Sequence, residues 1–183
     1  VVVHGIETPA QGQPIAASIT AALAERGVRS AYVQANLARA DEAAGLVDAA
    51  TRALGPIDIL VNNAGIQHTS PIESFPAERW DAILAINLSS AFHTMKAVLP
   101  GMRERGWGRI VNIASVHGLV ASVNKAAYLA AKHGLVGLSK GVALETATQG
   151  ITVNCICPGW TDTVLIQPQI DAACEGGCTM EKL

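Results

Sequence analysis

The sequence contains few aromatic and few charged residues. Only 4% of its 183 residues are aromatic and 15% are charged, whereas 50% are hydrophobic. A core made from such a chain must consist mainly of Ala, Val, Ile and Leu, a composition typical of a parallel sheet covered by helices on both faces. At this length we expect a single domain over residues 1–183.

The chain also lacks a strong charge of either sign and a long apolar run. Its net charge of −2 gives no basic field for nucleic acid, so we expect no nucleic-acid partner. No apolar run approaches the roughly 20 residues that span a bilayer. Val1–Val3 is too short to be the apolar part of a signal peptide, and we expect no membrane partner.

Cysteine is scarce, and its four positions indicate no metal centre. Cys155 and Cys157 alternate within an apolar segment, which predicts two small buried side chains. Cys174 and Cys178 lie in a polar tail that offers too few further ligands for a metal ion. This use of cysteine favours a cytoplasmic location, where thiols stay reduced.

Strand-like and helix-like segments alternate along the chain. We expect strands at residues 1–4, 28–34, 57–61, 109–114 and 151–157, and helices at about 13–26, 41–54, 76–105 and 125–147, the third helix in two pieces. This order predicts a doubly wound α/β sheet with right-handed crossovers. Ligands of such sheets bind beyond the carboxyl ends of the strands. The loops that start at Gly5, Asn62, Ser115 and Pro158 are therefore expected to line a site.

A hydroxyl, a phenol and an amine are expected to meet at this edge. Ser115 follows the strand at 109–114, and Tyr128 and Lys132 lie on one face of the next helix. A tyrosine titrates near pH ~10, and a lysine cation one turn away would lower that pKa toward the range of a useful base. The serine could hold a substrate oxygen while the tyrosine exchanges a proton with it. Alone, a Tyr-x-x-x-Lys pair is more often an ordinary exposed helix pair, but the other motifs reverse that interpretation.

Several motifs together resemble the short-chain dehydrogenase/reductase family. They are Asn62-Asn-Ala-Gly65, Asn87, Ser115, Tyr128-x-x-x-Lys132 and Pro158-Gly159, and the similarity extends over roughly residues 1–170. The resemblance implies a Rossmann-like fold and a catalytic tetrad of Asn87, Ser115, Tyr128 and Lys132. Asn87 lies within an expected helix, where Asn is a poor helix former and would loosen the helix locally.

The resemblance also implies a role for each residue of the tetrad. Tyr128 would be the general acid and base, and Ser115 would orient the substrate oxygen. Lys132 would lower the pKa of the tyrosine and bind the nicotinamide ribose, and Asn87 would hold a water molecule of a proton relay. The implied cofactor-binding residues are Asn63, Ala64, Gly65, Tyr128, Lys132, Pro158, Gly159 and Thr163.

Within this family the sequence is similar to the branch that oxidises (R)-3-hydroxybutyrate to acetoacetate. That similarity implies a substrate carboxylate held by Gln67, His117, Lys125 and Gln169. The residue types agree, because a lysine at the start of a helix opposes the macrodipole and suggests a negative partner. Taken alone, Lys125 could equally well be a solvated surface lysine. His117 taken alone could be a loop histidine with a backbone partner. Trp160 is interpreted as a wall that excludes water from the substrate, with simple packing as the alternative.

The cofactor expected from the sequence is NAD. An NADP enzyme usually places a basic residue near the 2′-phosphate, whereas the chain has none between His4 and Arg26. The substrate partner would be a small hydroxy or oxo carboxylic acid. The family also implies a homo-tetramer.

Two parts that the resemblance implies are not found. No Gly-x-x-x-Gly-x-Gly motif occurs, so the first strand with its phosphate-binding loop is lacking, and so is the last strand. The neighbours of the missing central strand should have exposed edges. Two alternatives therefore remain: a non-catalytic truncated remnant, and a reductase of another small oxo acid or 3-oxoacyl substrate.

Overall fold

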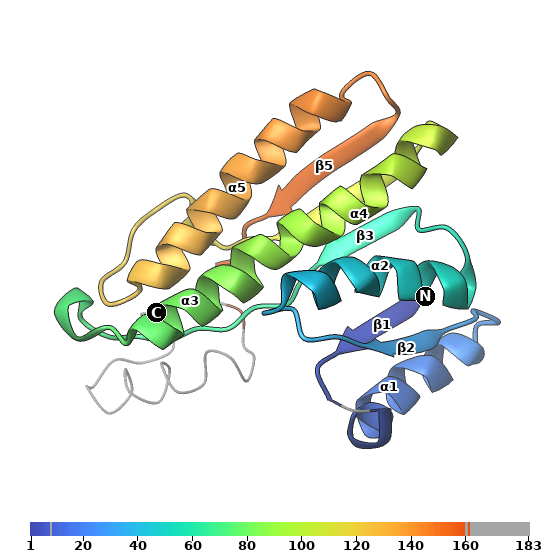
Figure 1. The fold of residues 1–183 in the computed structure, drawn as a ribbon, viewed down its shortest axis with the longest axis horizontal. Helices are drawn as coiled ribbons and strands as arrows, with labels where there is room; N and C mark the ends of the chain where they lie inside the picture. The colour runs from blue at the N-terminus through green and yellow to red at the C-terminus, as the bar shows by residue number, and fades with distance from the viewer. Residues whose placement is uncertain (8, 160, 162–183) are drawn as a thin grey trace.

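The computed structural model describes residues 1–7, 9–159 and 161. Its parallel strands are β1 (Val2–Gly5), β2 (Ala31–Gln34), β3 (Ile59–Asn62), β4 (Gly108–Ile113) and β5 (Ile151–Ile156). Its helices are α1 (Pro9–Ala24), α2 (Ala40–Leu54), α3 (Ala77–Leu84), α4 (Ser90–Arg105) and α5 (Ala126–Thr146). Strands and helices alternate as the sequence predicted, which confirms the α/β class (Figure 1).

The ends of the elements differ from the predicted ones for local reasons. The strand predicted from residue 28 begins at Ala31, because the chain is still turning at Gly27, which has a positive φ of 69°. The strand predicted from residue 57 begins at Ile59, after Gly55 with φ 98°. Both glycines adopt backbone angles that other residues rarely take, and each ends a helical segment.

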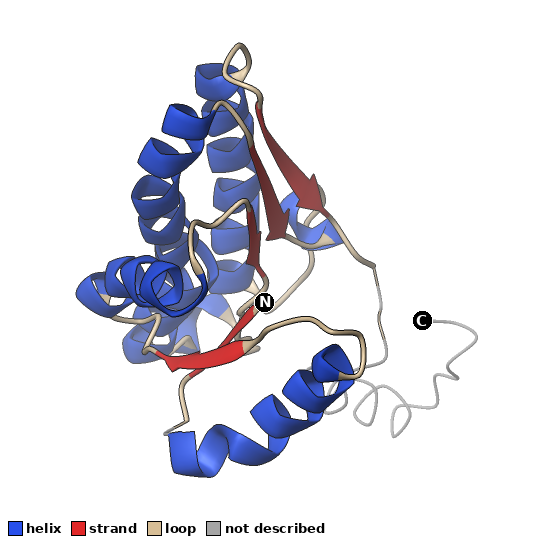
Figure 2. Cartoon of the chain, turned by 90° about the vertical axis from the view of Figure 1, so that its right-hand side faces the viewer, coloured by secondary structure: helices blue, strands red, loops and turns tan. Residues whose placement is uncertain are grey.

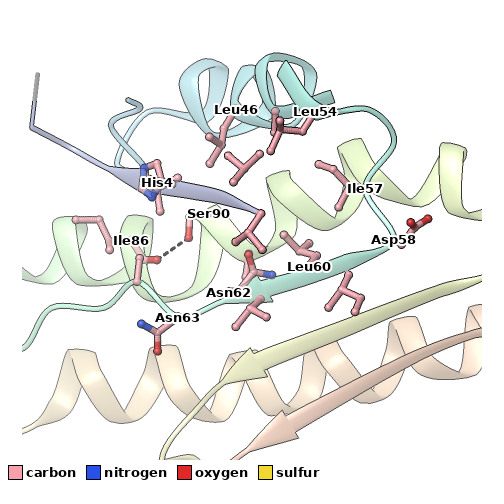
Figure 3. Close-up of a pocket in the computed structure, with 18 of the residues that line it drawn as sticks. His4, Leu46, Leu54, Ile57, Asp58, Leu60, Asn62, Asn63, Ile86 and Ser90 are labelled. Carbon is pink, nitrogen blue, oxygen red and sulfur yellow. Dashed lines mark hydrogen bonds between the residues drawn. The ribbon is translucent and has the colours of Figure 1, made fainter. Parts of the chain in front are cut away.

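The strands form two separate sheets rather than one. β1 pairs with β2, and β3, β4 and β5 form a second sheet in that order. β1 and β3 line opposite sides of a cavity of about 820 Å³ (Figure 3). In the described part of the chain, β1 pairs only with β2 and β3 pairs only with β4.

The larger sheet is buried on one face. Along β5 the residues alternate between buried and exposed, with Ile151 and Val153 in the core and Thr152 and Asn154 exposed. The helices α4 and α5 pack against the buried face. α1 lies on the far side of β2 from the other helices (Figure 2). Among the described residues, no helix covers the exposed face of β3–β5.

A chain of buried polar side chains joins the larger sheet to its helices. Asn112 on β4 is fully buried; its amide accepts a hydrogen bond from Asn62 Nδ2 at 2.8 Å and donates one to Ser139 Oγ at 2.7 Å. Thr94 Oγ1 on α4 donates to Asn62 Oδ1 at 2.8 Å. Since each lost partner would leave a buried polar group unsatisfied, these bonds fix how the strands and helices sit together.

One helical segment is apolar enough to cross a membrane by length and composition. Ala77–Arg105 contains a window of mean hydropathy 1.3, 44% of which is buried inside the protein. No segment of this kind was expected from the sequence. Here its apolar residues Met95, Val98 and Met102 belong to the core with Ile110 of β4. Helices of this kind are ordinary in protein cores, so the segment is weak evidence for a membrane span.

Two glycines with the same backbone conformation allow a test of the turn before β5. Gly150 and Gly27 both have φ +69°, but a Cβ on Gly150 would collide with the carbonyl oxygen of Gly106, whereas nothing lies within 4 Å of one on Gly27. We expect Gly27→Ala to lower the free energy of unfolding by about 1 kcal/mol, the cost of left-handed backbone. Gly150→Ala should lose roughly 1–3 kcal/mol more, because the turn must shift. Equal losses in urea unfolding would contradict this packing.

Candidate active site

The predicted hydroxyl, phenol and amine come together beyond the carboxyl end of β4. Ser115 follows β4, and its Oγ accepts a hydrogen bond from the backbone N–H of His117 at 3.1 Å. Tyr128 and Lys132 lie one turn apart on α5, and the side chain of Ser115 lies near enough to the phenol of Tyr128 to influence its pKa. All three side chains are buried, with 8%, 9% and 3% of their surface exposed. The interpretation as an ordinary exposed helix pair is therefore wrong.

Lys132 is held at one position by a backbone carbonyl. Its Nζ donates to the carbonyl oxygen of Ile113, at the end of β4, at 2.6 Å. The same nitrogen lies 5.6 Å from the ring centroid of Tyr128. Burial lowers the pKa of Lys132 to about 8, against an ordinary value of 10.5. A small change in its surroundings can therefore move this amine between its charged and neutral forms near neutral pH.

The pKa of Tyr128 shifts in the direction opposite to our expectation. Burial raises the pKa of the phenol, and the hydrogen bond with Ser115 lowers it by less. The Lys132 amine lies over the ring, and it loses part of its own charge through burial. The expected lowering of the Tyr128 pKa by the lysine is therefore not found in the protein alone, where desolvation dominates. A lower pKa of Tyr128 would need further positive charge or hydrogen-bond donors at the phenol oxygen.

Asn87 loosens its helix as predicted and fixes a loop of the site. It lies in a π-helical turn, Ala85–Ser89, between α3 and α4, and is 2% exposed. Its Oδ1 accepts a hydrogen bond from the N–H of Ile66, and its Nδ2 donates one to the carbonyl oxygen of Ile66, both at 2.9 Å. Turns of this type are frequent at functional sites. The clamp holds the loop that follows β3 against the centre of the site.

The residues expected to hold a carboxylate gather next to Tyr128. The ring of His117 meets that of Tyr128 edge to face, with centroids 6.2 Å apart. Burial lowers the pKa of His117, and the cation of Lys125 lowers it further. Lys125 itself is 8% exposed, so the solvated-surface interpretation is wrong. Burial also lowers the pKa of this amine.

A hydrogen bond between two loops brings Gln67 to the same region. The N–H of Ser70 donates to the carbonyl oxygen of Asn124 at 2.9 Å, so the loop after β3 lies against the residue before Lys125. Asn124 has φ 59°, the one positive value among described non-glycine residues. Nε2 of Gln67 is buried and has no hydrogen-bond partner within the described ranges. A buried donor without a partner costs ~1–3 kcal/mol, which a bound acceptor would recover.

The expected cofactor-binding segments lie at the same edge of the larger sheet. Asn63 and Ala64 follow β3 and line the cavity (Figure 3). The carbonyl oxygen of Pro158 accepts a hydrogen bond from the N–H of Val116 at 2.8 Å, which joins the loop after β5 to the loop after β4. Trp160, Thr163, Gln169, Cys174 and Cys178 lie outside the described residues.

Sequence reasoning missed the polar chain of Asn62, Asn112, Ser139 and Thr94. Its only signal is an Asn within an apolar strand, at residues 62 and 112, where a polar side chain needs a buried partner. The pairing Asn62↔Asn112 lies at the last positions of β3, immediately before the loop with Asn63. These buried hydrogen bonds set where both strands end, and thereby where the loops of the site begin.

The buried amine of Lys132 should make stability depend on pH. Because folding lowers its pKa from 10.5 to about 8, the unfolded chain binds more protons between those values, and stability rises with pH across the interval. Relative to Lys132→Met, the parent chain should gain up to about 3 kcal/mol in free energy of unfolding between pH 8 and 10.5. Urea unfolding at several pH values measures both proteins. If the free energies of unfolding of the two proteins changed in parallel with pH, the amine would not be desolvated in the folded chain.

Comparison with known proteins agrees with this geometry. The chain is 55% identical over 161 residues to a D-beta-hydroxybutyrate dehydrogenase of Cupriavidus necator, covering 88% of this chain and 62% of that protein. It is 53% identical over 150 residues to one of Rhizobium meliloti, covering 81% and 58%. The chain thus spans about 60% of the length of these relatives.

Solved structures give the same answer for the fold. A gluconate 5-dehydrogenase from Burkholderia cenocepacia, in complex with NADP and tartrate, superposes with a TM-score of 0.84 at 31% identity, over 94% of this chain and 66% of that one. A family model described as short chain dehydrogenase matches residues 7–173. The chain therefore belongs to the short-chain dehydrogenase family.

Proposed function

We propose that this chain carries the active site of an NAD-dependent dehydrogenase that oxidises (R)-3-hydroxybutyrate to acetoacetate. The relatives at 53–55% identity are named for this activity. The observation that carries the proposal is the buried Nε2 of Gln67, which has no hydrogen-bond partner among the described residues, on the loop that is hydrogen-bonded to Asn124. A small anion bound there would receive donors from Gln67, His117 and Lys125, as a carboxylate requires.

The residues present fit the nicotinamide end of the cofactor better than its phosphates. Asn63, Ala64, Gly65, Tyr128, Lys132, Pro158, Gly159 and Thr163 would hold that end. No glycine-rich turn follows a strand before β3 in the described part of the chain, so this chain offers little to the pyrophosphate. When bound, NAD supplies the hydride acceptor for the C3 hydrogen of the substrate.

The chain's own residues would manage the proton of the substrate alcohol. Ser115 donates a hydrogen bond to the C3 oxygen and orients it. The phenolate of Tyr128 takes the hydroxyl proton as the C3–H bond breaks, leaving a carbonyl group and a neutral tyrosine. The charged form of Lys132 favours that phenolate. Asn87 holds the loop and the water through which the proton is passed on.

Substrate selection would depend on the carboxylate contacts. Lys125 is the residue immediately before α5, where a cation opposes the helix dipole. An anionic substrate would pair with that cation and with His117, and Gln169 would complete the set. Trp160 would exclude water from the reacting carbon. These contacts favour a short hydroxy acid over a long acyl chain.

NAD is proposed over NADP because the chain places an acid where a 2′-phosphate would need a base. Glu7 follows β1, and no basic residue occurs before Arg26. The gluconate 5-dehydrogenase structure holds NADP and tartrate, which keeps a reductase of another small oxo acid or 3-oxoacyl substrate as the second candidate. The open cavity between β1 and β3 favours a third candidate, a non-catalytic remnant. In the complete enzyme we propose a cytoplasmic homo-tetramer.

Replacement of the proton-transfer residue should abolish turnover without preventing cofactor binding. In an assay of NADH formation from (R)-3-hydroxybutyrate, Tyr128→Phe should lower kcat by roughly 10²–10⁴-fold, the usual contribution of a positioned acid–base group. Its affinity for NADH, measured by fluorescence titration, should stay within a few fold of the parent. A kcat above one tenth of the parent value would remove Tyr128 from this role. A folded parent chain that forms no NADH would favour the remnant.

A substrate without its carboxylate should reveal the role of Lys125. Lys125→Met should raise KM for (R)-3-hydroxybutyrate by roughly 10–100-fold, the value of a charge-assisted contact. It should leave KM for the methyl ester nearly unchanged, because the ester carries no negative charge. Lys140→Met, on the exposed side of the same helix, is the matched control. Equal effects on acid and ester would contradict the assigned contact and favour a different oxo substrate.

A further inference from the structure

One residue beside the candidate site has a backbone conformation that side chains rarely adopt. Asn124 has φ 59°, and every other described residue with a positive φ is a glycine. Left-handed backbone carries a free-energy cost for most side chains, and Gly, followed by Asn, bears it most easily. The side chain of Asn124 is exposed. Packing of that side chain therefore does not explain the conformation, and the explanation must lie in what the backbone does.

The carbonyl group of Asn124 joins two loops of the site. It accepts a hydrogen bond from the N–H of Ser70 at 2.9 Å. In the described part of the chain, residues 121–124 make no other backbone hydrogen bond to a distant segment. The loop before Asn124 has little packing of its own, since Leu119 and Val123 are 59% and 82% exposed. This one bond therefore decides where that loop meets the loop after β3.

The segment that carries Gln67 is held on both sides by such hydrogen bonds. Before it, Asn87 accepts from the N–H of Ile66 and donates to the carbonyl oxygen of Ile66, both at 2.9 Å. After it, Ser70 is held by Asn124. Nε2 of Gln67 lies between these attachments, buried and without a hydrogen-bond partner among the described residues. The direction of this donor thus depends on both attachments.

The same turn places the amine of Lys125. Lys125 directly follows Asn124, and its carbonyl oxygen accepts a hydrogen bond from the N–H of Leu129 at 2.8 Å, so helical bonding begins at this residue. Only 8% of Lys125 is exposed, whereas Val123 is 82% exposed. The chain must pass from an exposed loop to a buried helix start over one residue. The left-handed conformation of Asn124 makes that turn, which Asn tolerates well.

We propose that Asn124 is a positioning residue of the carboxylate site. Its left-handed backbone, and not its side chain, holds the Gln67 loop and the Lys125 amine at the spacing that a carboxylate requires. One residue can do so because its carbonyl group is bonded to the first loop and the next residue carries the second donor. The inference deepens the proposed function and rests on the contacts proposed there for Gln67 and Lys125.

Two substitutions separate the backbone of Asn124 from its side chain. Asn124→Gly and Asn124→Val both remove the carboxamide, but glycine takes a positive φ readily and a β-branched residue does not. Val123→Ala, at the exposed neighbour, is the control. We expect Asn124→Val to weaken acetoacetate binding, followed by the NMR signals of the His117 ring, by about tenfold. Asn124→Gly should rescue the affinity to within about twofold of the parent, where Val123→Ala should also lie.

Two signals of the protein without ligand test the same claim. Burial lowers the pKa of Lys125, and in Asn124→Val this pKa should rise toward its ordinary value as the amine moves toward water. The amide of Ser70 should exchange with heavy water about tenfold faster in that variant, because its hydrogen bond opens more often. Asn124→Gly should keep both signals near those of the parent. NMR of isotope-labelled protein measures them, and Lys125→Met assigns the lysine signal.

Several results would overturn the proposal. Equal losses of acetoacetate affinity in Asn124→Gly and Asn124→Val would assign the role to the side chain. Equal affinity in the parent and Asn124→Val would show that the turn positions nothing. If Asn124→Val does not fold by circular dichroism, Asn124→Ala, a milder change at the same φ, takes its place.

Failure of the proposed function would look different. A parent chain that binds no acetoacetate would contradict that function, whereas the two ligand-free signals would still show whether Asn124 positions the loop and the amine. A faster exchange of the Ser70 amide together with a raised pKa of Lys125 in Asn124→Val would support the positioning role. If both signals in Asn124→Val matched those of the parent, the positioning role would be wrong as well.

Discussion

The buried hydrogen bonds from Asn62 through Asn112 to Ser139 hold the rest of the site in place. They tie the last residue of β3 to β4 and tie β4 to α5. Because buried amides and hydroxyls must keep their partners, β3, β4 and α5 cannot slide along one another without a large loss of free energy. The loops after both strands and the first turn of α5 therefore start from fixed positions. Ser115, Tyr128 and Lys132 meet because of that alignment.

Burial then decides the electrostatics of the site. Desolvation lowers the pKa of Lys132 to about 8 and raises the pKa of Tyr128, so both groups are biased toward their neutral forms. The same effect lowers the pKa values of His117 and Lys125. A site made of buried cation-forming groups favours an anionic ligand, which would restore their charged forms. The carboxylate of the proposed substrate fits this requirement, and Nε2 of Gln67, which has no partner among the described residues, would add a neutral donor to it.

Much of the fold and of the site could be predicted from periodicity and spacing. The alternation of segments gave the parallel topology, and Tyr128 and Lys132 four residues apart could share one helix face. The poor helix propensity of Asn87 indicated the interruption that the structure shows as a π-helical turn. The sign of the Tyr128 shift could not be predicted, because burial depends on the packing of distant segments. The partners of Asn112 lie 50 and 27 residues away in sequence, so no local pattern could reveal them.

We propose that Gln67, His117 and Lys125 form a site for a small carboxylate next to Tyr128. The most direct measurement is a titration of the His117 ring signals by NMR with acetoacetate, with acetone at equal concentration as the uncharged control. We predict a saturable shift with acetoacetate and a rise in the pKa of His117, since a bound anion favours the imidazolium form. Acetone should do neither. Equal responses to both compounds, or a pKa of His117 that does not rise with acetoacetate, would contradict the claim.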